Sequence, residues 1–384
     1  MMRYCHITLV AALVILAVAS WRAEAGTDGV LRQIDRMATE GEKAPPSLGE
    51  SIRDAAEADP KGVSAAILAK LKAGGLPAEQ EAVYCWALGL TRQPAAMDTL
   101  VDIYTGSKSD LLRSNCLRAI SMTRNQKAGE FLVKVLEGEK SEEMRYAILN
   151  LLGEMQYEGA LAKMEEVLKK DPEEYYWQSI FVFGKMGDKA VPFLIERIGD
   201  KDRNVRANAI NVLGQWLVAP EATKPLEERY WVESDKNTRS AILNSLERTI
   251  ADLSEMKAFF EQVVAKEKDT ELLGFAKETV AGMEEMKAAI AEGEENRTPS
   301  AAAFKTALTE LDRSAGKKGD YRALAISSVL SDEPSLKALR ARILQRDSDE
   351  AFEDYQKVNN IIIFNRHAAC WAAPLESTGS SDAK

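Results

Sequence analysis

Apolar residues recur along this chain in a pattern that repeats about every 32 residues. The clearest copy runs from Asp200 to Gly214, where acidic turn residues lead into an amphipathic segment that ends on a glycine. With Arg206 as position zero, the pattern starts again at Glu81, Arg113, Arg145, Tyr176, Arg239 and, in degenerate form, Gly274. The intervals are 32, 32, 31, 30, 33 and 35 residues, which is typical of one helix–turn–helix unit per repeat.

Residues three, four and seven positions after each start are apolar almost throughout, as in Ala209, Ile210 and Leu213. These offsets lie on one face of a helix, so the pattern predicts a buried stripe on the second helix of each unit. Offset eight holds a small residue, at Gly89, Ser121, Gly153, Gly184 and Gly214. We expect a helix to end there or a neighbouring helix to approach closely. The first helices are predicted at residues 63–71, 95–103, 128–136, 160–168 and 190–198.

An acidic residue stands three or four positions before most of the starts, where it suits the positive end of a helix. Ser109, Ser141 and Asp202 are the predicted N-caps. The residue at position zero can then bond the acid of its own or a neighbouring turn. The predicted structural ladder consists of Asp110, Arg113, Glu142, Arg145, Asp202, Arg206, Asp235 and Arg239.

The run Asp-x-x-Val-Arg-x-x-Ala-x-x-x-Leu-Gly from Asp202 to Gly214 resembles the second helix of a HEAT repeat. The resemblance covers roughly residues 62–283 and implies an all-α fold, a right-handed α-solenoid of stacked helix pairs with Asp and Arg in a ladder. The short period resembles the bacterial HEAT-like repeats found, for example, in bilin lyases. Two departures, Glu81 and Tyr176 at position zero, put the ladder in doubt in those units.

The segments around the repeats complete the predicted organisation. Residues 26–61 read as an N-terminal helical cap, which an array needs to cover its apolar end. The array itself is predicted over 62–295, followed by a charged linker or loop at 292–300 that contains Pro299. Residues 296–370 form a C-terminal helical region, either degenerate repeats or a cap. Residues 371–384 are rich in Ser, Gly and charge, so we expect a disordered tail.

The first 25 residues have the layout of a secretory signal peptide: Arg3, an apolar run from Leu9 to Ala19, and small residues around Ala23 and Ala25. Cleavage before Gly26 predicts a secreted or periplasmic protein with no integral membrane segment, and an uncleaved anchor is the alternative. Without Arg3, Arg22 and Glu24, 48 basic and 59 acidic residues remain, a net charge of −11. Such a charge disfavours nucleic acid as a partner.

The mature chain would keep three cysteines and a single histidine. The odd number of cysteines argues against a disulfide framework. Cys85 and Cys116 fall on the core stripe of adjacent repeats, so a bridge is conceivable, but neighbouring helices typically lie about 8–10 Å apart and a disulfide needs Cα atoms within about 7 Å. Two buried thiols are the expected state.

The sequence shows no catalytic constellation. One histidine is too few for a His-Glu-x-x-His zinc site, and no phosphate-binding loop or Gly-x-Ser-x-Gly motif is present. His367 and Cys370 stand one turn apart and could supply two metal ligands or an activated thiol, although such a pair is more often incidental. We therefore predict no catalytic residues, no metal site and no cofactor.

The side of each second helix opposite the buried stripe carries offsets two and five, about 140–200° around from position zero. In HEAT-like stacks the second helices line the concave surface. This strip is rich in amides and free of acids, and it includes Trp86 and Phe181. The predicted binding residues are Trp86, Arg118, Asn150, Gln178, Phe181, Asn208, Asn211 and Asn244. The alternative is that the aromatic residues pack against the next repeat.

These features predict an exported scaffold that binds a protein or peptide partner on its concave face. Two other functions stay open: an enzyme scaffold that handles a small ligand or chromophore, as the resemblance to bilin lyases implies, and a passive module of an envelope assembly. The lack of a nucleophile or acid–base set argues against an enzyme.

Overall fold

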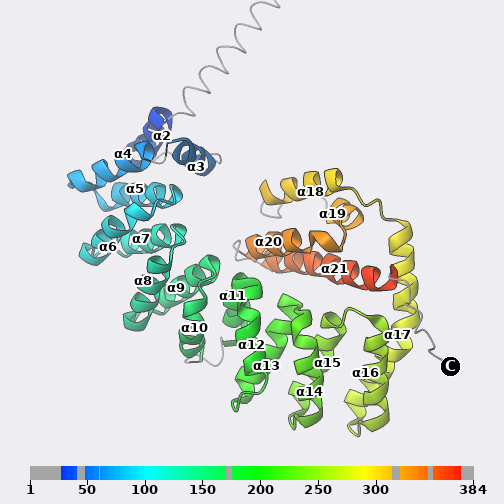
Figure 1. Ribbon diagram of the computed structural model, residues 1–384. Coiled ribbons are helices and arrows are strands. Elements are labelled where there is room, and N and C mark those ends of the chain that lie inside the picture. Colours follow the sequence, from blue (N-terminus) through cyan, green and yellow to red (C-terminus); the bar gives the residue numbers. More distant parts are fainter. Residues whose placement is uncertain are drawn as a thin grey trace, which may run out of the picture. The chain divides into compact units, whose positions relative to one another are not determined.

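The computed structural model describes residues 27–40, 48–59, 61–169, 175–313, 321–344 and 349–372 (Figure 1). Within these ranges the regular structure is entirely helical, which confirms the predicted all-α solenoid fold. The chain divides into two compact units, residues 1–160 and 161–384. The predicted signal peptide and its cleavage site lie outside the described residues, as does the predicted tail beyond Ala372.

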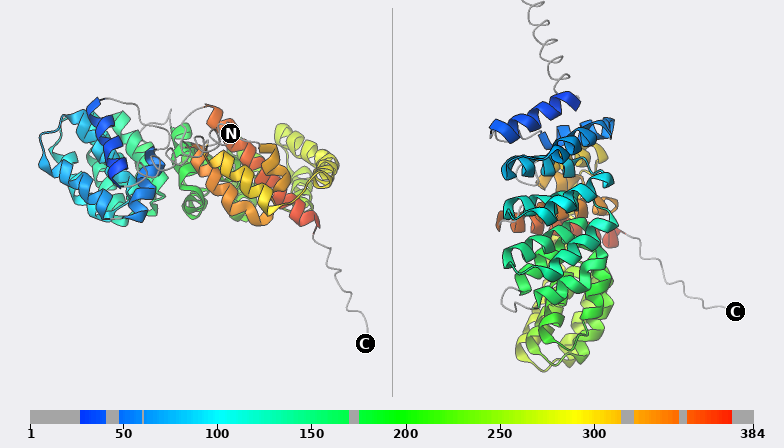
Figure 2. Two further views of the ribbon diagram at one scale, coloured as in Figure 1. Left: turned by 90° about the horizontal axis from the view of Figure 1, so that it is seen from above. Right: turned by 90° about the vertical axis from the view of Figure 1, so that its left-hand side faces the viewer.

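The N-terminal unit begins with two helices that precede the repeats, α2 (Thr27–Glu40) and α3 (Leu48–Ala58). Three helix pairs follow: α4 (Gly62–Ala73) with α5 (Ala78–Leu90), α6 (Met97–Gly106) with α7 (Asp110–Met122), and α8 (Gln126–Gly138) with α9 (Glu142–Met155). The pairs stack in successive layers (Figure 2), with the second helices α5, α7 and α9 packed against one another in that order.

The C-terminal unit continues with four pairs and ends in four further helices. The pairs are α10 (Leu161–Leu168) with α11 (Tyr175–Met186), α12 (Val191–Arg197) with α13 (Arg203–Asn211), α14 (Thr223–Val232) with α15 (Lys236–Thr249), and α16 (Leu253–Lys266) with α17 (Thr270–Glu295). A π-helix, η4 (Val212–Leu217), extends α13. The last helices are α18 (Ala301–Arg313), α19 (Tyr321–Ser327), α20 (Glu333–Ile343) and α21 (Asp349–Ala372).

The second helices begin where the sequence predicts, because short polar side chains cap them. Ser109 accepts a hydrogen bond from the Leu112 N–H, and Asp202 accepts one from the Asn204 N–H. Ser141 does the same for Met144. The three predicted N-caps are confirmed; each satisfies a backbone donor that the helix itself leaves unpaired.

The predicted stripe is buried in both units, with Cys85, Ile120, Leu152, Phe183 and Leu213 all at the centre of the packing. Two glycines at offset eight explain how tightly the second helices meet. A Cβ added to Gly89 would lie 2.5 Å from the Cα of Ala119, and one added to Gly214 would lie 2.6 Å from the Cα of Ser245. Both positions therefore require glycine because a neighbouring backbone occupies the space.

The charged segment predicted as a linker from Glu292 is partly helical. Helix α17 runs without a break to Glu295, and the loop before α18 starts only at Asn296. Side-chain charge alone does not end a helix: α17 carries Glu at several exposed positions, and helices stop where a Pro such as Pro299 blocks the next turn.

Candidate binding face on the second helices

The side of the second helices that carries offsets two and five is here called the second-helix face. In the N-terminal unit this face is open to solvent. Trp86 of α5 is half-buried and packs against the core, Arg118 of α7 is exposed, and Asn150 of α9 is half-buried. Leu111, two positions before Arg113, is 52% exposed on the same side of α7. The predicted binding strip used only offsets two and five and so omitted Leu111. Leu111 lies on the same side of the helix, one turn towards its N-terminus from offset two.

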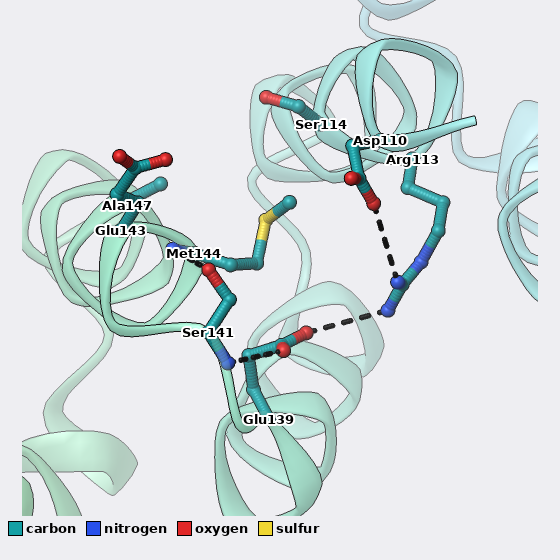
Figure 3. A pocket seen from close by; sticks show the side chains of 8 residues that line it. All are labelled: Asp110, Arg113, Ser114, Glu139, Ser141, Glu143, Met144 and Ala147. Carbon is teal, nitrogen blue, oxygen red and sulfur yellow. Dashed lines mark hydrogen bonds and ion pairs between the residues drawn. The ribbon is translucent and has the colours of Figure 1, made fainter. Parts of the chain in front are cut away.

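A polar pocket of about 340 Å³ lies beside this face, between the N-terminal turns of α7 and α9 (Figure 3). Its lining residues are Asp110, Arg113, Ser114, Glu139, Ser141, Glu143, Met144 and Ala147. The Arg113 guanidinium points at two carboxylates, with Nη2 3.3 Å from Glu139 and Nη1 3.8 Å from Asp110. The pocket therefore contains a step of the arginine ladder.

Arg113 contacts its predicted acid Asp110, but three of the ladder arginines pair with a glutamate that the repeat pattern did not mark. Arg113 pairs with Glu139, Arg206 pairs with Glu233 at 3.0 Å, and Arg239 pairs with Glu267. Each of these glutamates directly follows the first helix of the next repeat. Asp202 and Asp235, by contrast, cap their own helices. Glu142 is exposed, and Arg145 donates to the carbonyls of Glu139 and Lys140.

Each ladder glutamate also holds the start of the next second helix. One oxygen of Glu139 accepts from the Lys140 and Ser141 N–H groups, and one oxygen of Glu267 accepts from Lys268 and Asp269 in the same way. Glu233 accepts from the Asp235 N–H. The arginine of one repeat is thus linked through a buried carboxylate to the backbone of the next, which fixes the stacking of adjacent pairs.

Glu233 gives the ladder a measurable pH dependence. Burial raises the pKa of this carboxyl, but hydrogen bonds from the Asp235 N–H, Arg229 and Arg206 outweigh burial and bring the pKa to about 2, below its ordinary 4.5. Because the folded pKa is depressed, the stabilisation is complete above pH 4.5 and is lost as the pH falls towards 2. Glu233→Gln should therefore lower stability at pH 7 by about 3 kcal/mol, and the deficit should shrink at pH 3 in urea unfolding.

The matched control is Glu228→Gln, at an exposed position of the same helix, which we expect to leave stability unchanged at both pH values. If the free energies of unfolding of the Glu233 variant and the wild type differ by the same amount at pH 7 and pH 3, Glu233 is not the source of the pH dependence.

Over α11 and the π-helix of the C-terminal unit the second-helix face is covered by the chain's own last helices, whereas Asn244 of α15 is exposed. Phe181 of α11 stacks edge-on against Phe352 of α21, with ring centroids 4.7 Å apart. Trp216 contacts the same ring at 5.1 Å, and Trp177, although 53% exposed, lies 6.5 Å from it. Phe181 is therefore not an open binding residue. The alternative prediction was that it packs against the next repeat, but it packs against α21 instead.

The π-helix supplies the backbone groups to which the last helices bind. The last carbonyls of a helix have no intrahelical donors, and here those of Trp216, Leu217 and the following Val218 are free to accept from other segments. Tyr355 Oη and Asn359 Nδ2 both donate to the Trp216 carbonyl, at 2.7 and 3.1 Å, and Arg340 Nη1 donates to that of Leu217 at 2.9 Å. Arg366 Nη1 donates to the carbonyl of Val218 at 2.6 Å. Figure 1 shows α20 and α21 running across this part of the unit.

The amides predicted on the face behave differently from one another. Asn208 is buried, with 4% exposure, so its side chain is not available to a partner in this covered region. Asn211 and Asn244 each donate to a carbonyl of their own helix, Ala207 and Ser240. Gln178 is half-buried. An amide four residues after a carbonyl is satisfied locally, so amide content was a poor sign of a binding surface.

His367 and Cys370, which stand one turn apart in sequence, have different surroundings. The Nδ1 atom of His367 lies 2.7 Å from the Ala251 carbonyl, and burial lowers the pKa of the imidazole. Cys370 is an exposed thiol. His367 also lines a largely apolar pocket of about 370 Å³ with Arg248, Ile290, Ile363 and Phe364. Among the described residues, no three His, Cys, Asp or Glu side chains gather as a metal site requires.

Comparison with known proteins agrees with the repeat architecture. A family model described as HEAT repeats matches residues 97–180 and 161–247, and no curated protein matches the chain. Among solved structures, the chain is similar to the complex of CpcE and CpcF of phycocyanin lyase from Nostoc sp. PCC7120, with 17% identity over 63% of this chain and 96% of that one and a TM-score of 0.30. A TM-score this low supports no conclusion about function.

No helix in the described part of the chain is both long enough and apolar enough to span a bilayer. The matched residues 97–247 cover the helix pairs from α6 into α15 and contain the ladder pairs Arg113–Glu139 and Arg206–Glu233. Residues 97–247 of this chain are similar to HEAT repeats.

Proposed function

We propose that this protein is exported and binds a protein or peptide partner on the second-helix face of its N-terminal unit. Export is supported by the Arg3 n-region, the apolar run from Leu9 to Ala19 and the small residues before Gly26. The net charge of −10 makes an acidic polymer such as nucleic acid a poor partner.

One observation supports the second-helix face of the N-terminal unit as the binding surface. In the C-terminal unit the second-helix face already binds a helix: Phe181 contacts Phe352 of α21, and Tyr355 and Asn359 from the same helix bond the π-helix. Trp86 and Arg118 occupy the equivalent offset in the N-terminal unit and remain half-buried and exposed. The partner would therefore present an amphipathic helix with an aromatic residue towards Trp86 and a carboxylate towards Arg118.

The small-ligand alternative rests on the pocket around His367. Its apolar wall and the Arg248 cation suit a small carboxylate with an apolar body. Glu247 also lines this pocket, so a carboxyl group and the His367 imidazole stand beside the Arg248 cation.

Affinity capture from envelope and extracellular fractions of the source organism tests the proposed face. The variant Leu111→Lys with Arg118→Glu changes only exposed side chains of α7, so its helical circular dichroism should match the wild type while capture of the partner falls at least about tenfold, the loss of one hot-spot contact.

The control for this experiment is Lys134→Glu, at an exposed position of the first helix α8, and it should capture the partner as the wild type does. Equal recovery by the α7 variant and the control would reject the face, and loss of the partner in both would point to overall charge.

A further inference from the structure

Two cysteines meet in the core of the N-terminal unit. Cys85 of α5 and Cys116 of α7 are both completely buried, and their Sγ atoms lie 3.7 Å apart. Both are free thiols in the structure. They belong to consecutive repeats, so a bond between them would join two helix pairs 31 residues apart in sequence.

The two helices approach far more closely than packed helices usually do. Since a C–C bond is about 1.5 Å long, a Gly89 Cβ placed 2.5 Å from the Ala119 Cα puts the two Cα atoms within about 4 Å of each other. Cys85 stands one turn before Gly89, and Cys116 stands one turn before Ala119. The usual 8–10 Å helix separation, which argued against a bridge, therefore does not hold at this junction.

We propose that Cys85 and Cys116 are a redox pair that forms a disulfide between the first two repeats when the chain folds in the presence of a disulfide oxidant. One thiolate attacks a sulfur of an external disulfide such as oxidised glutathione, and one thiol of that oxidant is released. The second cysteine then attacks the mixed disulfide and releases the other thiol. The two cysteines are oxidised, the external disulfide is reduced, and the two protons end on the released thiols.

Burial determines when this reaction occurs. The contact with Cys116 and burial both raise the pKa of Cys85, and a protonated, enclosed thiol reacts slowly. The bond should therefore form while α5 and α7 are still docking, and once enclosed it should resist external reductants. The exposed Cys370 provides an internal contrast because it stays accessible in the folded chain.

The bond would also affect the proposed binding face. This effect on binding rests on the proposed function, whereas the disulfide itself does not. Trp86 directly follows Cys85, and Arg118 lies two residues after Cys116. A covalent link between α5 and α7 would fix the distance between these two binding residues. It would therefore reduce the conformational entropy that is lost when the partner binds.

The test uses the full mature chain carrying Cys370→Ser, unfolded in urea with reductant and refolded with or without oxidised glutathione. After alkylation and trypsin digestion, the oxidised sample should contain residues 73–92 joined to residues 114–118. Its helical circular dichroism should equal that of the reduced sample, and its thermal midpoint should be roughly 5 °C or more higher. The folded reduced chain, given the same oxidant, should form the link at least about tenfold more slowly.

The control, Cys116→Ser with Cys370→Ser, should give neither the joined peptides nor the shift in midpoint. Mixed glutathione adducts without the joined peptides would overturn the proposal, as would a linked chain that loses helicity or melts no higher than the reduced one. These measurements need no binding partner. Failure to form the disulfide would therefore not contradict the proposed binding face, and failure to capture a partner would not contradict the redox pair.

Discussion

Replacing Arg340 with methionine is expected to free the C-terminal helices from the repeats that they cover. Arg340 is 2% exposed, and its Nη1 donates to the Leu217 carbonyl at 2.9 Å and to Asn359 Oδ1 at 2.7 Å. Methionine fills similar space but leaves both acceptors buried and unpaired, at a cost of about 3 kcal/mol. Hydrogen exchange of peptides from α21 should accelerate on the order of 100-fold if these helices open as a local unit.

The matched control is Arg203→Met in the same unit. The Arg203 side chain is 56% exposed and lies 3.3 Å from Asp235, an exposed pair worth at most about 1 kcal/mol. If α21 exchanges at the same rate in both variants, the buried guanidinium does not hold the C-terminal helices in place.

Two glycine-to-alanine substitutions in the C-terminal unit should change stability in opposite directions. At Gly214 the new Cβ would lie 2.6 Å from the Ser245 Cα, a backbone atom that cannot rotate away. We expect a loss of about 2–3 kcal/mol from overpacking. At Gly282 in α17 the new Cβ would meet nothing within 4 Å, and alanine should stabilise the helix by about 0.5–1 kcal/mol.

Far-UV circular dichroism during thermal unfolding measures both changes, and Gly282→Ala serves as the control for Gly214→Ala because the chemical change is identical. A fall in the midpoint for the first and a small rise for the second are predicted. A rise in both midpoints would mean that helix propensity, rather than the contact between η4 and α15, decides the result.

The repeat period was sufficient to predict the helix pairs, because packing at offsets three, four and seven is local to each unit. The same holds for Ser109, Ser141 and Asp202, since a cap acts within one turn. Gly89 and Gly214 were predicted to allow a close approach, and Ala119 and Ser245 are the residues that they meet.

The ladder partners could not be read from the spacing. Glu139, Glu233 and Glu267 stand 26 to 28 residues after their arginines, at the end of the following first helix, and no motif ties them to position zero. Of the acids that the pattern did mark, Asp202 and Asp235 cap their own helices, and Asp235 also pairs with Arg203 rather than with Arg239.

The return of the C-terminal helices was also beyond the sequence pattern. The hydrogen bonds of Arg340, Tyr355 and Arg366 to the π-helix span 123, 139 and 148 residues. Periodicity reports how one helix face is buried but not which distant segment buries it. As a result, Phe181 and Trp86 looked equivalent in sequence, although Phe181 packs against the distant helix α21 and Trp86 packs against the core of its own repeats.

The most direct test of the proposed partner face is site-specific photocrosslinking in the source organism. A photoreactive residue is placed either at Arg118 on the second-helix face or at Lys134 on α8, both exposed positions of the N-terminal unit. We expect a discrete adduct with one protein from the Arg118 position and no such adduct from Lys134. Adducts of equal yield from both positions, or from Lys134 alone, would contradict it.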